Sequence, residues 1–155
     1  MAAMYEAASC GAACEQGDVT GRSERVGAPI VFLDDNEIFI RYVRAVATAA
    51  EANVVTLTDS WRLPSVLACH RPPTVITDLH MPCRDAIELL PVLAASEVVA
   101  HLVIVSGVQS PVLSAAAQLA RARHSWTVET WTKPIRTAFL HERLAAFSGR
   151  RPAEN

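Results

Sequence analysis

The stretch VITDLHMP, residues 75–82, ends a short apolar run on an aspartate and follows it with a Met-Pro pair. A buried strand that ends on a carboxylate must solvate or pair that charge, because an isolated buried charge is costly. Asp78 is therefore either a cap for the next turn or a reactive group held at the tip of a strand. The pattern of the rest of the chain decides between these two interpretations.

Five short apolar segments alternate with five segments of helical spacing. Several of the apolar segments lack polar alternation, which is typical of parallel strands covered by helices on both faces. With right-handed crossovers, the repeat predicts an α/β, flavodoxin-like (βα)5 doubly wound fold, with a five-stranded parallel sheet in the order 2-1-3-4-5. The predicted strands are 30–35, 53–59, 74–78, 101–107 and 126–132, and the predicted helices are 36–52, 60–70, 84–96, 110–123 and 134–147.

Local signals refine these predicted helices. Asn36 is expected to be an N-cap, and Ser110 followed by Pro111 is a typical helix start. The last helix is expected to bury an apolar stripe made of Ile135, Phe139, Leu140, Leu144 and Phe147.

The 155 residues are 51% hydrophobic and 19% charged, which suits one packed domain. We predict a flexible arm over residues 1–28, the domain over 29–148 and a frayed tail over 149–155. A net charge of −2 gives no electrostatic footprint for nucleic acid, and no apolar run approaches the ~18 residues of a membrane span. We therefore expect neither nucleic acid nor membrane as a direct partner.

Polar residues stand at the end of four predicted strands: Asp34 and Asp35, then Asp78, Ser106 and Lys133. Because the first and third strands are neighbours in the predicted order, their three carboxylates should converge at one edge. Clustered carboxylates repel, so one should stay protonated or a cation such as Mg²⁺ should bind. An aspartate beside such an ion can attack phosphorus, and a hydroxyl and an ammonium group would hold the phosphoryl oxygens.

The segments FLDDN, VITDLHMP, IVSG and WTKP, in this order and each at a strand tip, together resemble the receiver domain of two-component response regulators. The resemblance covers residues 30 to about 147. The roles that it implies are phosphoacceptor for Asp78, direct metal ligand for Asp35, metal ligand through water for Asp34, metal-binding backbone carbonyl for His80, hydroxyl switch for Ser106 and phosphate-binding group for Lys133. Pro134 matches a proline whose preceding peptide bond is often cis in this family.

The resemblance implies a phosphorylation-controlled signalling module of the bacterial cytoplasm, and not an enzyme beyond slow Mg²⁺-dependent self-phosphorylation and dephosphorylation. A histidine kinase, a phosphotransfer protein or an acyl phosphate would phosphorylate Asp78. The face formed by helix 4, strand 5 and helix 5 would then bind a downstream protein or a second copy. Since little sequence follows the fifth helix, we expect no output domain in this chain, which either acts alone or is an excised module.

The sequence departs from the family pattern at Thr130, where the family usually has an aromatic residue. Trp131 comes one residue later, and a one-residue shift along a strand places a side chain on the other face. A degenerate receiver that acts without phosphate therefore stays open. So does a loose similarity of SGVQSPVLSAAAQLARA to receivers attached to EAL-type cyclic-di-GMP regulators. We interpret Trp61, Trp126 and Trp131 as packing residues more readily than as partner anchors.

Two other classes with comparable folds fit less well. A haloacid-dehalogenase-type phosphatase would have a D-x-D pattern after the first strand, where this chain has adjacent aspartates. An FMN-binding flavodoxin would have a Ser-, Thr- or Gly-rich loop there, and the acidic DDNE would repel its phosphate.

Overall fold

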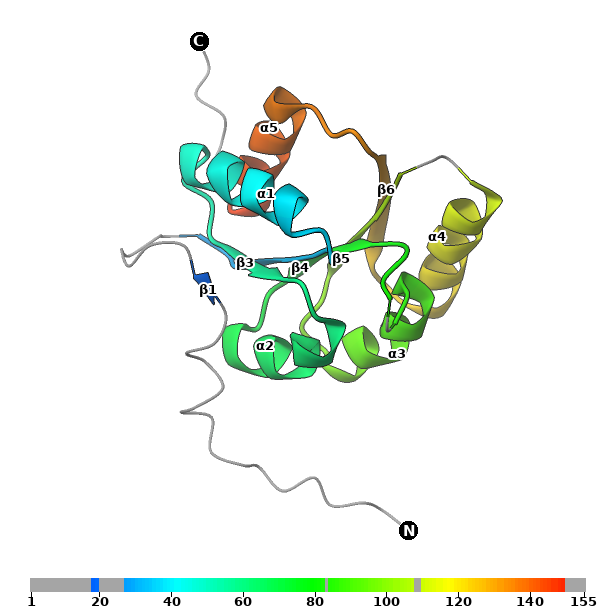
Figure 1. Cartoon of the computed structure of the whole chain (residues 1–155). Helices are drawn as coiled ribbons and strands as arrows, with labels where there is room; N and C mark the ends of the chain where they lie inside the picture. The colour runs from blue at the N-terminus through cyan, green and yellow to red at the C-terminus, as the bar shows by residue number, and fades with distance from the viewer. Residues whose placement is uncertain (1–17, 20–26, 83, 108–109, 150–155) are drawn as a thin grey trace.

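The computed structural model describes residues 18–19, 27–82, 84–107 and 110–149. In these residues, one sheet has the strand order β1-β3-β2-β4-β5-β6 (Figure 1). Its parallel strands are β2 (Ile30–Leu33), β3 (Val54–Leu57), β4 (Thr74–Asp78), β5 (His101–Ser106) and β6 (Thr127–Thr132). These five follow the predicted order 2-1-3-4-5, so the fold prediction is confirmed.

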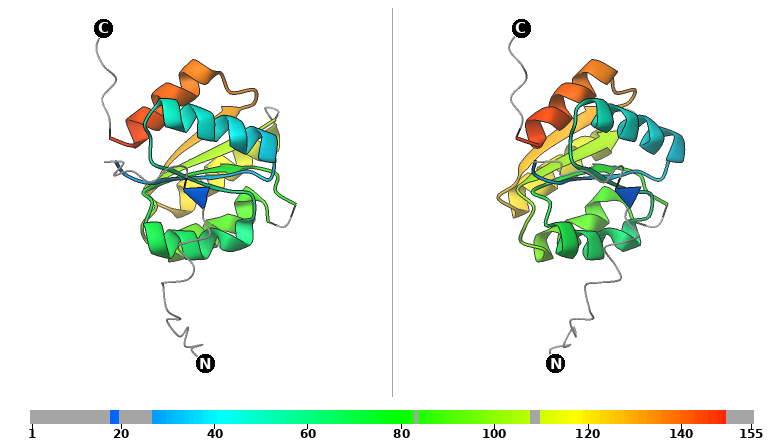
Figure 2. Two further views of the ribbon diagram at one scale, coloured as in Figure 1. Left: turned by 60° about the vertical axis from the view of Figure 1, so that its left-hand side comes forward. Right: turned by 90° about the vertical axis from the view of Figure 1, so that its left-hand side faces the viewer.

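The helices form a layer on each side of the sheet (Figures 1 and 2). One layer contains α1 (Glu37–Ala49) and α5 (Thr137–Phe147), and the other contains α2 (Leu63–His70), α3 (Ala86–Ala95) and α4 (Pro111–Arg123). A 3-10 turn, η2 (Ser60–Arg62), leads into α2. In the described part of the chain, no helix is both long enough and apolar enough to cross a membrane.

The central strands are buried along their whole length because both faces of the sheet are covered. Successive residues of β2 alternate between the two cores: Ile30 and Phe32 face α1 and α5, whereas Val31 and Leu33 face α2, α3 and α4. Burial of each such side chain contributes roughly 1.5–3 kcal/mol. This double burial explains the uninterrupted apolar runs in the sequence.

The expected helix starts at Asn36 and Ser110 are confirmed. Oδ1 of Asn36 accepts hydrogen bonds from the backbone N–H groups of Ile38 and Phe39, at 3.0 and 3.1 Å. Oγ of Ser110 accepts from the N–H of Leu113 at 3.2 Å. These bonds satisfy N–H groups that lack a partner within the helix.

The last helix differs from its prediction. It begins at Thr137 instead of residue 134, because residues 134–136, which follow a cis Lys133–Pro134 peptide bond, form the connection from β6. Phe139 is 37% exposed, contrary to its predicted burial. Leu140 and Leu144 are buried as expected, Ile135 is buried just before the helix, and Phe147 is partly buried.

The N-terminal segment also differs from its prediction. Asp18 and Val19 form β1, which pairs antiparallel with Thr56 and Val55 of β3 at the sheet edge. The predicted arm over residues 1–28 therefore contains a short strand. Residues 1–17 and 20–26 of that arm, and residues 150–155 of the predicted tail, lie outside the described residues.

Candidate functional site

Lys133 joins two aspartates at the edge where the strands end. Its Nζ lies 2.5 Å from Oδ2 of Asp34 and 2.9 Å from Oδ1 of Asp78. The two carboxylates come from the ends of neighbouring strands β2 and β4, and Lys133 comes from the end of β6. The structure therefore brings these three predicted site residues into direct contact.

Each of these carboxylates is also held by a backbone N–H group of its own turn. Oδ1 of Asp34 accepts from Asn36 at 2.9 Å, and Oδ2 of Asp78 accepts from His80 at 3.0 Å. Only 1% of Asp34 and 7% of Asp78 is exposed. With both oxygens engaged, each carboxylate has a fixed orientation, and Asp34 is almost completely shielded from solvent.

Burial and charge pull the pKa values of this cluster in definite directions. Burial raises the pKa of Asp34, although Lys133 and the N–H of Asn36 oppose that shift, and the charge of Asp78 adds to it. Burial lowers the pKa of Lys133, but its hydrogen bonds to Asp34 and Asp78 outweigh this effect, so that pKa is raised overall. Lys133 thus stays charged at neutral pH, and it is the only lysine of the chain.

The other predicted site residues surround this cluster. Ser106 is buried at the end of β5, and its carbonyl oxygen accepts a hydrogen bond from the N–H of Lys133 at 2.8 Å. Asp35 and His80 are exposed, each in the turn that follows a strand. Ser106 is therefore attached to the lysine through the backbone, while Asp35 faces solvent beside the buried pair.

The carboxylates offer hard oxygen donors, the type that Mg²⁺ prefers. In the described ranges, however, no three His, Cys, Asp or Glu side chains are gathered so as to hold a metal ion. Instead, the ammonium of Lys133 lies between Asp34 and Asp78. The donor chemistry thus fits a magnesium ion, and an ion that uses these oxygens must compete with Lys133 for them.

Helix α1 supports the position of Lys133, which the sequence analysis did not foresee. The Phe39 ring lies 4.6 Å from Nζ of Lys133, within the range of a cation–π contact. The hydroxyl of Tyr42 donates to the carbonyl of Ile135 at 2.8 Å and so fastens the segment after the lysine. The sequence carries one signal for these two contacts. Residues 39 and 42 are three positions apart, so they lie on one face of a helix that begins at the site.

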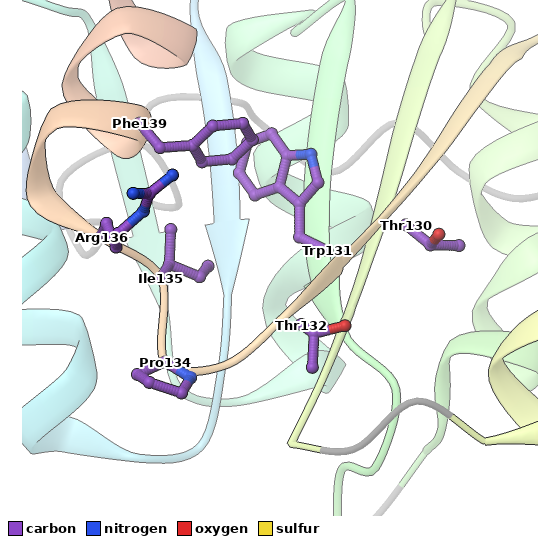
Figure 3. Close-up of a pocket in the computed structure, with 7 residues that line it drawn as sticks. All are labelled: Thr130, Trp131, Thr132, Pro134, Ile135, Arg136 and Phe139. Atoms are coloured by element: carbon purple, nitrogen blue, oxygen red, sulfur yellow. The ribbon is translucent and has the colours of Figure 1, made fainter.

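The two neighbouring residues in β6 lie on opposite faces of the sheet. Thr130 is exposed, whereas Trp131 is 5% exposed and points toward α5 (Figure 3). Trp131 packs edge-on against Phe139, at 5.2 Å between ring centroids, and stacks on Phe147 at 6.2 Å. Trp131 therefore does not replace the missing aromatic of position 130, as the period of two predicts.

Glu129 fixes Trp131 through a polar cluster that the sequence analysis missed. Oε2 of Glu129 accepts from the indole N–H of Trp131 at 3.2 Å. Oε1 lies 2.9 Å from Nε2 of His101 and also accepts from Arg143 of α5. A cavity of about 310 Å³ lies beside this region, between β6 and the start of α5 (Figure 3), and Thr130, Trp131, Thr132, Pro134, Ile135, Arg136 and Phe139 line it.

The structure is similar to solved receiver domains. A response regulator from Colwellia psychrerythraea is 28% identical, with a TM-score of 0.66, over 80% of this chain and 98% of that one. The chemotaxis protein CheY4 of Vibrio cholerae is 18% identical, with a TM-score of 0.65, over 78% and 98% of the two chains. The receiver domain of the Francisella response regulator 1452 is 16% identical, with a TM-score of 0.63, over 79% and 97%.

No protein-family model matches the sequence, and no curated protein matches it as a relative. The likeness to solved structures nevertheless confirms the predicted resemblance: the chain has the fold of response-regulator receiver domains.

Proposed function

We propose that the chain is a receiver module of a two-component system, which accepts a phosphoryl group on Asp78. The observation that carries this proposal is the ammonium of Lys133, which bridges Asp34 and Asp78 at the carboxyl end of the sheet. That edge is where doubly wound folds bind their ligands. The likeness to receiver domains supports the same role.

In the proposed reaction, a carboxylate oxygen of Asp78 attacks the phosphorus atom of the donor. A new P–O bond forms and the P–N bond of a phosphohistidine breaks; the imidazole nitrogen keeps the electron pair and gains a proton from water. With acetyl phosphate, a P–O bond breaks instead and acetate leaves. Lys133 exchanges its contact with Asp78 for the phosphoryl oxygens, and the hydroxyl of Ser106 donates a hydrogen bond to them.

We assign Mg²⁺ to Asp34, Asp35, Asp78 and the backbone carbonyl of His80. When bound, the ion supplies positive charge that offsets the repulsion between the carboxylates and the phosphoryl group. Asp34 and Asp78 must share their oxygens between this ion and Lys133, because Lys133 contacts both.

The proposed partners are a bacterial cytoplasmic histidine kinase or phosphotransfer protein and, on the output side, a protein target or a second copy. The output surface consists of α4, β6 and α5 and includes the cavity of Figure 3. Phe139, which is 37% exposed at this cavity, offers apolar area for such a contact. The module signals through binding, and its own chemistry is limited to slow phosphoryl transfer and loss.

A second candidate function is a protein-interaction module that works without phosphate. The exposed Thr130 favours it, because a small side chain there cannot fill space behind Ser106 in the way a large ring can. The receiver of an EAL-type cyclic-di-GMP regulator is a special case of the first proposal, in which the output lies in another domain.

Intact-mass spectrometry distinguishes these candidates. With Mg²⁺ and acetyl phosphate, the wild-type protein should gain one phosphoryl group, EDTA should block the gain, and Asp78→Asn should abolish it. Asp59→Asn is the matched control: Asp59 ends the loop after β3 and caps η2 through its side chain, a role that asparagine fills equally well. Labelling that persists in Asp78→Asn contradicts the assigned nucleophile, and an unlabelled wild type favours the phosphate-independent module.

A further inference from the structure

An exposed tryptophan and an arginine form a stacked pair at the edge of the sheet that carries the site. The guanidinium carbon of Arg84 lies 3.7 Å from the centroid of the Trp61 ring. Trp61 belongs to η2 and is 57% exposed, while Arg84 is half-buried in the connection from β4 to α3. The interpretation of Trp61 as a packing residue does not account for this exposure.

The strand order places this pair in the connections after the two strands that flank β2. Trp61 follows the carboxyl end of β3, Arg84 follows that of β4, and β2 lies between these two strands. Two strand spacings separate β3 from β4 by roughly 10 Å, so the contact between Trp61 and Arg84 joins two connections whose strands flank β2. Asp34 and Asp35 follow the end of β2. The pair lies in the segments that lead into α2 and α3, and these helices cover one side of the sheet (Figure 1).

Arg84 carries its charge without a carboxylate partner among the described residues: no ion pair connects it to any of them. Its guanidinium carbon lies over the Trp61 ring, 3.7 Å from the ring centroid. Lys133, in contrast, is engaged by two carboxylates. Arg84 is thus a cation in the connection that begins after Asp78, and it can bind an arriving anion without first breaking a salt bridge.

We propose that Arg84, held by Trp61, recruits the phosphoryl donor to Asp78. This inference rests on the proposed receiver function and assigns a specificity-determining residue for it. The ligand chemistry is a tetrahedral phosphoryl dianion, in an acyl phosphate or on an imidazole ring, which the guanidinium fork binds through two hydrogen bonds. The tryptophan sets the height and direction of the guanidinium, and the donor passes from Arg84 to Asp78, where Lys133 takes over its charge.

The test is the initial rate of phosphorylation by acetyl phosphate, measured by intact mass as a function of donor concentration and salt. Arg84→Gln should lower the second-order rate constant about five- to tenfold, as expected when one charge near the path of an anion is lost. The loss should appear as a higher half-saturating donor concentration with a similar maximal rate. Arg84→Lys should recover part of the rate, because it restores the charge but not the fork.

Two further variants make the assignment specific. Trp61→Leu keeps Arg84 but removes its platform, so it should slow phosphorylation about two- to fivefold and weaken the salt dependence. Arg123→Gln removes the same charge from the exposed last turn of α4. Because α4 runs antiparallel to the strands, this turn lies at their amino ends, away from the site. The variant should therefore leave the rate unchanged. Circular dichroism establishes that each variant is folded before its rate is compared.

The outcomes separate this inference from the function on which it rests. A wild type that gains no phosphoryl group contradicts the receiver function itself. A wild type that is labelled, together with an Arg84→Gln variant labelled at the same rate and half-saturation, contradicts only the role of Arg84. If Arg84→Gln does not fold, equal rates for Trp61→Leu, Arg84→Lys and wild type overturn the inference.

Discussion

The end of β6 and the middle of β6 differ in how their side chains are arranged. At the end, Lys133 joins Asp34 and Asp78, so that charges from three strands meet at one edge of the sheet. In the middle, the side chains divide between the two faces, with Thr130 exposed on one and Trp131 buried against α5 on the other. The proposed phosphoryl chemistry depends on which residues lie at the carboxyl ends of the strands, whereas the proposed conformational response depends on which face of the sheet a side chain occupies.

This difference means that the proposed chemistry and the proposed response can vary independently. A shift of one position moves a ring from one face of a sheet to the other, while the strand ends stay where they are. Trp131 is fixed on the α5 side by two rings and by Glu129. A swinging aromatic at Thr130 therefore cannot be the bistable element of this protein.

The largest expected effect tests the two faces of β6 directly. Trp131→Ala should lower the free energy of unfolding by about 3–5 kcal/mol, because it leaves a cavity between β6 and α5 that its neighbours fill only in part. Thr130→Ala, at the adjacent exposed position, should change it by less than about 0.5 kcal/mol. Urea unfolding followed by far-ultraviolet circular dichroism measures both.

The comparison between the losses of unfolding free energy in Trp131→Ala and Thr130→Ala tests whether the two side chains lie on opposite faces. Similar losses for both variants would mean that Thr130 also supports the core, and the assignment of opposite faces would fail. Phe139→Ala serves as an intermediate control, since that ring contacts Trp131 but is 37% exposed.

The next effect concerns the ammonium at the end of β6. Lys133→Met should lower the free energy of unfolding by roughly 1–3 kcal/mol at pH 8, because the buried carboxylate of Asp34 loses its charged donor. The raised pKa of Lys133 means that the folded protein holds this proton more tightly than the unfolded chain does. Its contribution is therefore complete below about pH 10.5 and is lost as the pH rises through the folded-state pKa.

Urea unfolding at pH 8 and pH 11 tests this sign. The difference in the free energy of unfolding between wild type and Lys133→Met should become smaller at pH 11. The corresponding difference between Lys133→Arg and Lys133→Met should stay the same, because arginine remains charged at that pH. Because Lys133 is the only lysine, no other ammonium side chain contributes to the change. Removal of the competing charge should also leave Mg²⁺ affinity, measured by tryptophan fluorescence, unchanged or higher.

Strand positions and the site edge could be predicted because they follow from pattern. Apolar runs such as 74–78 marked the buried strands, and the polar residue after each run marked the shared edge. Asp34, Asp78 and Lys133 meet for that reason alone, although 99 residues separate the first from the last. The helix N-caps at Asn36 and Ser110 could also be predicted, because an N-cap depends on one side chain and its local turn.

The remaining features depend on contacts between elements that no local pattern records. Trp61 and Arg84 meet across an intervening strand, and Glu129 gathers partners from β5, β6 and α5. The start of α5 was misplaced because helical spacing extended through residues that connect the helix to β6. The strand β1 has two residues, too few for a periodic signal.

The smallest expected effect is an absence of change in the middle of β6. Beryllofluoride with Mg²⁺ mimics a phosphoryl group, and its binding at Asp78 should draw the hydroxyl of Ser106 toward it. The amide resonances of residues 78–82 and 84–85, together with those of Ser106, Gly107 and 110–113, should then shift in NMR spectra. Residues 83 and 108–109, which belong to the same two connections, lie outside the described residues.

Residues 128–131 should keep their resonances nearly unchanged in the same spectra. Trp131 is held by Phe139, Phe147 and Glu129 in the free protein, and movement of Ser106 on the neighbouring strand leaves those three contacts intact. Without a large side chain that rearranges, the two states should differ by a smaller free energy, so that a measurable fraction of the unphosphorylated protein adopts the active arrangement. Large shifts through residues 128–131 and α5 on beryllofluoride binding would show that β6 does carry the response. The exposed Thr130 would then need a different explanation, such as a whole-strand displacement that moves Trp131 and α5 together.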